Sequence, residues 1–110
     1  MFPASEFQNR ISKVKRVAEE EGFDIVLTST EEDIYYLTGV AFRVFERPFI
    51  LGVPVDGTPF LLLPSLEEDH FLSRRRIDIP CKIYEEYPYS EDLSYVSVLM
   101  TELKSYKKVG

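Results

Sequence analysis

The feature that most constrains the fold is a short apolar run between two helical patterns. Residues 24–29 read Asp-Ile-Val-Leu-Thr-Ser, which is nearly all apolar and rich in β-branched side chains. Such a run is typical of a strand covered on both faces, because a strand with one solvated face alternates apolar and polar residues. The chain is therefore expected to pack helices against a β-sheet.

Helical patterns lie on both sides of this run. A helix is predicted over residues 6–21, where Ser5 and Gln8 have the spacing of a capping box and Gly22 supplies a stop. Its apolar residues at helical spacing are Phe7, Ile11, Val14 and Ala18. After the apolar run, Thr30 begins a second capping pattern, and Gly39 ends a short second helix.

The rest of the chain repeats this alternation. Asp56-Gly57 is a tight-turn signal and predicts a hairpin over residues 48–64. The further expected elements are a helix from Ser65 to the arginine run at 74–76, a strand over 80–84, a loop over 87–90, a helix over 91–106 with Leu93, Val96, Met100 and Leu103 on one face, and the start of a strand at 107–110. The sequence thus predicts one α/β domain over residues 1–110, a mixed β-sheet flanked by helices. The unfinished last strand indicates excision from a longer chain.

Composition excludes several classes of function. Nineteen acidic against thirteen basic residues give a net charge of −6, which disfavours binding to a phosphate backbone. No apolar run approaches the roughly 20 residues that cross a bilayer, so no membrane partner is expected. The first six residues lack a secretory signal, and the lone Cys81 forms no disulfide framework. We expect a soluble, cytoplasmic protein.

The residue types that carry chemistry are scarce. The single histidine, His70, is expected on a helix surface, and Cys81 is expected to point into the core as an inert thiol. Acidic clusters at 19–21, 31–33 and 67–69 are explained by helix dipoles and solvated helix ends. Gly39 and Gly52 stand alone and form no phosphate-binding loop; Gly52 is expected at a close-packed strand position. We therefore expect no catalytic residue, metal site or cofactor in this chain.

One segment favours ligand binding. If residues 40–47 are extended, alternation places Arg43, Phe45 and Arg47 on one side. Two guanidinium groups flanking an aromatic ring suit a ligand that carries a carboxylate, since each guanidinium can donate two charge-assisted hydrogen bonds. The alternative is a strand edge whose arginines pair with nearby acids. Arg43, Phe45 and Arg47 are the candidate substrate-binding residues.

Several blocks together resemble a known family. The blocks are Gly22-Phe23-Asp24-Ile25-Val26-Leu27, Ile34-Tyr35-Tyr36-Leu37-Thr38-Gly39, and Asp56-Gly57 before the apolar strand that ends Leu63-Pro64. With the first helix, they resemble the N-terminal domain of creatinase/prolidase proteins, the family of Xaa-Pro aminopeptidases and Xaa-Pro dipeptidases. The resemblance covers nearly the whole chain, and the Tyr-Leu-Thr-Gly block is its most specific part.

The resemblance implies a partner domain and a role. Family members continue into a catalytic domain, absent here, whose two divalent metal ions are held by two Asp, one His and two Glu. No residue of this chain matches that ligand set. Phe45 and Arg47 have a spacing similar to the aromatic residue and Arg of family creatinases, which reach the neighbouring subunit's active site and hold the substrate carboxylate. The resemblance also implies a homodimer of the full-length protein and a peptide substrate shared with the catalytic domain.

Three hypotheses follow. The first is the non-catalytic N-terminal domain of a proline-specific metallopeptidase, contributing to dimerisation and to the substrate entrance. The second is a stand-alone peptide- or protein-binding module derived from this family, whose acidic charge suits a basic ligand. The third is the N-terminal domain of a creatinase-like amidinohydrolase. The choice between dipeptidase, aminopeptidase and amidinohydrolase stays open at this point, as does the identity of the metal.

Overall fold

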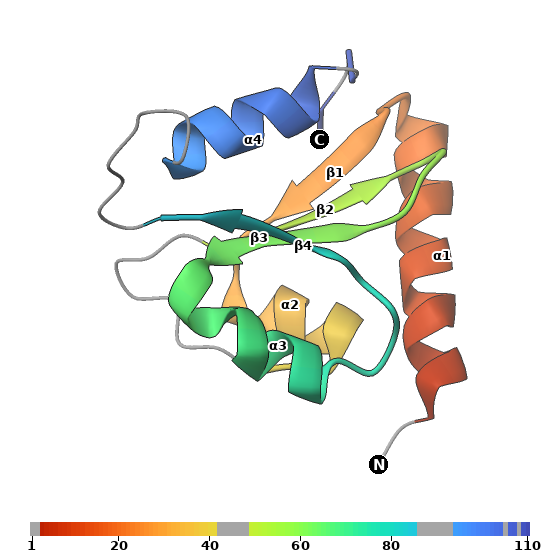
Figure 1. Ribbon diagram of the computed structural model, residues 1–110. Helices are drawn as coiled ribbons and strands as arrows, with labels where there is room; N and C mark the ends of the chain where they lie inside the picture. The colour runs from red at the N-terminus through yellow and green to blue at the C-terminus, as the bar shows by residue number, and fades with distance from the viewer. Residues whose placement is uncertain (1–2, 42–48, 86–93, 105, 108) are drawn as a thin grey trace.

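The chain folds into helices packed on a β-sheet, as a computed structural model shows for residues 3–41, 49–85, 94–104, 106–107 and 109–110 (Figure 1). The helices are α1 (Ala4–Glu21), α2 (Glu31–Thr38), α3 (Glu68–Arg74) and α4 (Tyr95–Leu103). The strands are β1 (Ile25–Thr28), β2 (Ile50–Pro54), β3 (Phe60–Pro64) and β4 (Cys81–Tyr84). A 3₁₀ turn over Ser65–Glu67 leads directly into α3.

The strands of the described residues form one mixed sheet in the order β1-β2-β3-β4. β1 pairs antiparallel with β2, and β2 with β3, whereas β3 and β4 run parallel. The antiparallel β2–β3 pair is the predicted hairpin, and its turn contains Asp56 and Gly57. The predicted fold class is therefore confirmed.

The two faces of the sheet are covered by different helices. α1, α2 and α3 contribute Ile11, Ile34, Leu37 and Phe71 to a core that also contains side chains of β2 and β3, while α4 crosses the opposite face (Figure 1). The register separates the faces, because Leu51 lies opposite Leu61 and both belong to this core. On the other face the rings of Tyr84 and Tyr95 meet edge to face at 5.7 Å, which joins β4 to α4.

Local signals set the end of α1 and both ends of α2, but not the start of α1. Gly22 and Gly39 take the left-handed conformation, with φ of 82° and 81°, and Thr30 accepts a hydrogen bond from the Asp33 amide, as predicted. The capping box at Ser5 is wrong. α1 begins two residues earlier than predicted, at Ala4, and its N-cap residue is Pro3, which makes no side-chain cap. The Glu6 amide donates instead to the Pro3 backbone carbonyl at 3.0 Å. Ser5 consequently lies inside the first turn.

The last helix and the first strand also differ from expectation. α4 is shorter than the predicted helix, and Val96 and Met100, which were expected on its packed face, are 53% and 61% exposed. Its half-buried apolar residues are instead Val98, Leu99 and Leu103. β1 lies at one edge of the described sheet, and within it only Ile25 is fully buried, so the strand is less covered than its composition predicts. Residues 87–93 of the predicted loop and helix lie outside the described residues.

Candidate functional site

The predicted substrate-binding residues Arg43, Phe45 and Arg47 lie outside the described residues. The structure does describe the residues on either side of their segment. Val40 before it and Phe49 after it are each 1% exposed, and both belong to the core beneath the sheet. The segment is therefore attached at both ends to well-packed positions.

The residues before the segment form a hydrogen-bonded helix end. The Thr38 hydroxyl is buried, donates to the Ile34 carbonyl at 2.7 Å, and accepts from the Val40 amide at 3.2 Å. Gly39 then reverses the chain, and its amide donates to the Tyr35 carbonyl at 2.8 Å. A side-chain hydroxyl that satisfies a backbone donor lets the chain leave a helix inside the core.

Helix α3 and the residues after it also contact the C-terminal end of α2 and the residues that follow it. The Arg76 amide donates to the Thr38 carbonyl at 3.0 Å. The Nε2 atom of His70 lies 3.2 Å from the Ala41 carbonyl oxygen, and its Nδ1 atom lies 3.0 Å from Nη1 of Arg74. Since a guanidinium can only donate, Nδ1 accepts from Arg74, and Nε2 carries the proton that it donates to Ala41. The predicted surface histidine thus links α3 to the residue just before the 42–48 segment.

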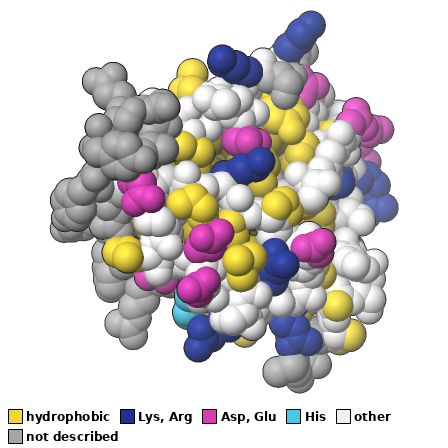
Figure 2. Space-filling view, in the orientation of Figure 1, with side chains coloured by type: hydrophobic (Ala, Val, Ile, Leu, Met, Phe, Trp, Pro, Cys, Tyr) yellow, Lys and Arg dark blue, Asp and Glu magenta, His cyan; other side chains and the backbone are white. Residues whose placement is uncertain are grey.

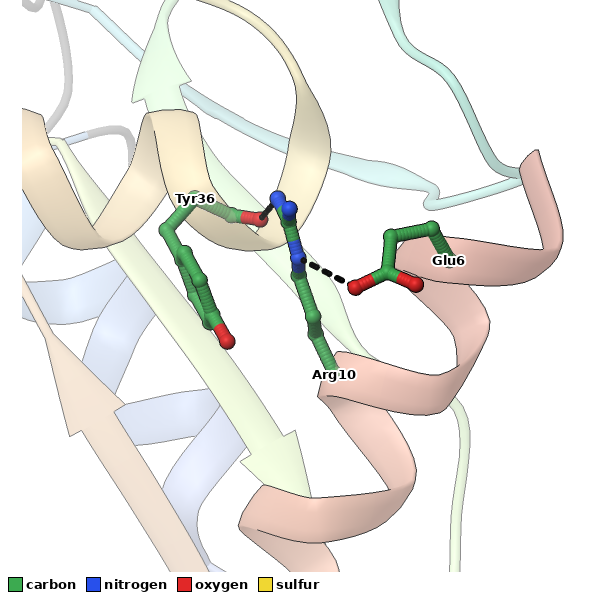
Figure 3. A network of polar contacts seen from close by, with 3 residues as sticks. All are labelled: Glu6, Arg10 and Tyr36. Carbon is green, nitrogen blue, oxygen red and sulfur yellow. Dashed lines mark hydrogen bonds and ion pairs between the residues drawn. The ribbon is translucent and has the colours of Figure 1, made fainter. Parts of the chain in front are cut away.

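An arginine joins α1 to the other side of the same helix end. Figure 3 shows Arg10 between Glu6 and Tyr36. Its Nη1 donates to the Tyr36 carbonyl at 2.7 Å, its Nε lies 3.4 Å from a Glu6 carboxylate oxygen, and its guanidinium carbon stands 4.2 Å from the centroid of the Tyr36 ring. A helix-terminal carbonyl needs such a donor, and cation–π contact adds to it. Arg10 therefore fixes the C-terminal end of α2 against α1.

Two further features of the described residues bear on chemistry, the Cys81 thiol and the grouping of acidic side chains. Burial, with the Glu68 carboxylate adding and Arg75 opposing, raises the pKa of the Cys81 thiol from 9.0 to about 11, so the thiolate that would act as a nucleophile is scarce. Among the residues that the structure describes, no group of three or more His, Cys, Asp or Glu could hold a metal ion. These residues do not fit the two-metal centre that the family resemblance assigns to the catalytic domain.

The surface carries charges of both signs. On the face drawn in Figure 2, acidic and basic side chains alternate with hydrophobic ones over the described part of the chain. None of the described helices combines the length and the apolar character of a membrane-spanning segment.

Sequence reasoning missed the contacts that hold the end of α2. Arg10 carried no signal, since it sits on a helix among other charged residues. Thr38 belongs to the Tyr-Leu-Thr-Gly block, which marked it as part of a motif without revealing its buried hydroxyl.

Two relatives that match this chain in sequence are peptidases. The chain is 33% identical over 58 residues to an uncharacterized peptidase found in two strains of Staphylococcus epidermidis, an alignment that covers 53% of this chain and 16% of the peptidase. The chain therefore spans about a sixth of the length of those relatives.

Solved structures share the fold. The N-terminal domain of a Xaa-Pro dipeptidase from Lactobacillus brevis superposes with a TM-score of 0.79 at 19% identity, covering 91% of this chain and 73% of that one. A prolidase from Thermococcus sibiricus gives 0.73 at 22% identity, with 89% of this chain and 25% of the prolidase covered. The N-terminal domain of an X-Pro dipeptidase from Streptococcus pyogenes gives 0.67 at 25% identity, covering 73% and 63%.

The family assignment rests on most of the chain. Residues 10–110 match the profile of the Creatinase/Prolidase N-terminal domain, and this range includes β1, the helix end at Thr38-Gly39 and the β2–β3 hairpin. The chain belongs to the Creatinase/Prolidase N-terminal domain family, whose structural relatives here are N-terminal domains of Xaa-Pro dipeptidases and prolidases.

Proposed function

We propose that this chain is the non-catalytic N-terminal domain of a proline-specific metallopeptidase, a Xaa-Pro dipeptidase or aminopeptidase. The observation that carries the proposal is the match of residues 10–110 to the family profile. The uncharacterized peptidases among its relatives support a peptide substrate, and the X-Pro dipeptidase domain at 25% identity supports one that contains proline. In this proposal a second domain supplies two divalent metal ions and the hydrolytic chemistry, and the protein is cytoplasmic.

The role of this domain is to shape the substrate entrance. Arg47, Arg43 and Phe45 would contact the substrate end of a neighbouring subunit, with the guanidinium groups binding its carboxylate. The buried positions of Val40 and Phe49 support this role, because they anchor both ends of the segment. Ordered anchors reduce the entropy lost when a recognition segment meets its ligand.

The test is kinetic and uses the longest natural form of the protein that contains this chain. Replacing Arg47 with Ala should raise KM for Xaa-Pro dipeptides about tenfold or more, since a charge-assisted hydrogen bond contributes about 1.5–3 kcal/mol. Arg16→Ala is the matched control, because Arg16 is exposed on α1 and its loss changes the net charge equally. Equal kinetics for both variants across several dipeptides would refute the entrance role.

Dimerisation is tested separately. Sedimentation equilibrium of the same protein should give twice the monomer mass. If Arg47 acts across the interface, mixing the Arg47→Ala protein with a variant inactivated in its metal domain should restore activity, because one site of the mixed dimer then has both an intact metal domain and Arg47. A monomer with full activity contradicts this part of the proposal.

The net charge favours a second candidate, a binding module for basic peptides. Its signature would be salt-sensitive capture of Lys- and Arg-rich peptides by the 110-residue chain alone, with scrambled acidic peptides as controls. A native polypeptide no larger than this chain would support that candidate and exclude a following metal domain. A creatinase-like parent would instead hydrolyse an amidino compound and leave proline dipeptides intact.

A further inference from the structure

An apolar groove lies between α1 and β1. It has a volume of about 380 Å³, a size found among sites that bind small ligands. Gly110 contributes to its wall, and its apolar lining comes from Val14, Val17, Ala18, Phe23, Val26 and Tyr36. Three of these side chains remain well exposed despite their size, namely Val17 at 54%, Tyr36 at 49% and Phe23 at 37%. Apolar surface gathered in one exposed hollow is typical of a binding site.

Side chains of opposite charge stand at the two ends of this groove. Lys13, Val17 and Glu21 recur every four residues along α1, so they share one face of the helix, and all three line the groove. Both charged residues are exposed, and in the described part of the chain neither side chain takes part in an ion pair or a hydrogen bond. The groove therefore offers a free cation at one end and a free anion at the other, with apolar side chains between them.

The spacing of these charges matches a short peptide. Lys13 and Glu21 are eight residues apart on α1, which is about 12 Å along the helix axis. An extended peptide rises about 3.3 Å per residue, so about four residues span the same length. The terminal carboxylate of such a peptide then meets Lys13, and its terminal ammonium group meets Glu21. Alternate side chains of an extended peptide point to opposite sides, so half of them lie against the apolar lining.

We propose that this groove binds short apolar peptides of about four residues that carry free termini. Charge complementarity identifies this ligand, because an aliphatic acid could pair with Lys13 but has no cation for Glu21. Arg10 also lines the groove and adds positive charge at the carboxylate end, although it is bonded to α2 as well. The inference goes beyond the proposed function, because it uses none of residues 42–48 and holds whether or not the protein is a peptidase.

The experiment titrates the 110-residue chain with the peptide Val-Leu-Leu-Val and follows the amide NMR signals of the chain. This peptide has the same sequence in both directions, so its side chains fit the groove equally in either orientation. Signals of Val17, Val26 and Tyr36 should shift most. Lys13→Glu and Glu21→Lys should each weaken binding about fivefold or more, because an exposed attraction becomes a repulsion. A peptide with blocked termini should bind the parent chain more weakly and should bind the charge variants as it binds the parent.

The double variant that combines Lys13→Glu with Glu21→Lys is the decisive control. It keeps the net charge of the parent and exchanges the two ends of the groove, so the peptide should bind in the reverse orientation with most of its affinity. Glu20→Lys is the matched control for Glu21→Lys, because Glu20 is exposed on α1 outside the groove lining and its replacement changes the net charge equally. It should leave the affinity within about twofold of the parent, since solvent and salt screen exposed charges.

Val17→Asp tests the apolar lining in a chain that still folds. Because Val17 is 54% exposed, the melting temperature should scarcely change, while peptide binding should be lost. Signal shifts away from the groove, equal binding by the parent and both single charge variants, or a double variant as weak as the single ones overturn the proposal. Tighter binding of decanoate than of the peptide overturns it as well, because the groove is then a site for aliphatic acids.

Discussion

At the scale of single residues, Thr38 of the Tyr-Leu-Thr-Gly block stabilises the C-terminal end of α2. Its hydroxyl is fully buried and bonds both the Ile34 carbonyl and the Val40 amide. Thr38→Val keeps the shape but leaves the Val40 amide without that acceptor, so we expect a loss of about 1–3 kcal/mol in the free energy of unfolding. Urea denaturation measures it. Thr101→Val, on the exposed side of α4, is the control and should stay within about 0.5 kcal/mol of the parent.

Cys81 gives a prediction about pH. Its thiol pKa is raised, chiefly by burial, from 9.0 to about 11. In the unfolded chain the thiol ionises from about pH 9 while in the folded chain it stays protonated, so its contribution to stability is complete below pH 9 and is lost as the pH rises through 11. Denaturation of Cys81→Ala beside the parent should show a steeper decline for the parent between these values. Parallel curves would contradict the raised pKa. Alkylation near pH 8 should likewise be slower in the folded chain than in urea.

At the scale of elements, two glycines end helices with the same backbone geometry and different surroundings. Gly22 and Gly39 have φ of 82° and 81°, but a Cβ at Gly22 meets nothing within 4 Å, whereas one at Gly39 would collide with the Arg76 side chain and lie 3.2 Å from the Phe7 ring. Gly22→Ala should cost about 1–2 kcal/mol for the left-handed conformation alone. Gly39→Ala should cost about 1–3 kcal/mol more, from overpacking. Thermal denaturation of the two variants measures the difference, and equal losses would show that Arg76 moves aside freely.

Elements whose ends depend on local chemistry could be predicted from the sequence. The predicted helix start at Thr30, helix end at Gly39 and hairpin turn at Asp56-Gly57 are confirmed. Each depends only on the backbone of residues adjacent in the sequence. The predicted cap at Ser5 is wrong because α1 already begins at Ala4, with Pro3 at its N-cap, so Ser5 lies within the first turn. In α4 the predicted face contained Val96 and Met100, but Val98 and Leu99 are the half-buried residues, because the position of the sheet sets which side of the helix is packed.

The candidate site also combines a local sequence pattern with contacts between residues far apart in the sequence. The alternation of Arg43, Phe45 and Arg47 is a local pattern, and it stays a prediction. The contacts at the C-terminal end of α2, before this segment, are not local. His70 and Ala41 are 29 residues apart, and Arg10 and Tyr36 are 26 apart. Only the packing of α1 and α3 against the end of α2 brings these pairs together.

At the scale of the whole molecule, the two faces of the sheet are unequal. The face under α1, α2 and α3 holds the main core, and every residue of β3 is buried. α4 covers the other face without a single buried residue. Buried apolar area is the main source of stability. We therefore expect α4 to unfold locally, independently of the main core, and at a lower cost in free energy.

Native-state hydrogen exchange tests this order. The amides of β3 are bonded between β2 and β4 and should exchange only through global unfolding, whereas those of α4 should exchange through local opening. We expect protection factors in β3 at least about tenfold above those in the middle of α4. Leu99→Ala should speed exchange in α4 and leave β3 nearly unchanged, because Leu99 is half buried on the packed side of that helix. Exposed Met100→Ala, one residue along the same helix, is the matched control and should affect neither. Equal protection in α4 and β3 would mean that the two layers unfold as one unit and that the thin contact under α4 is stronger than its burial indicates.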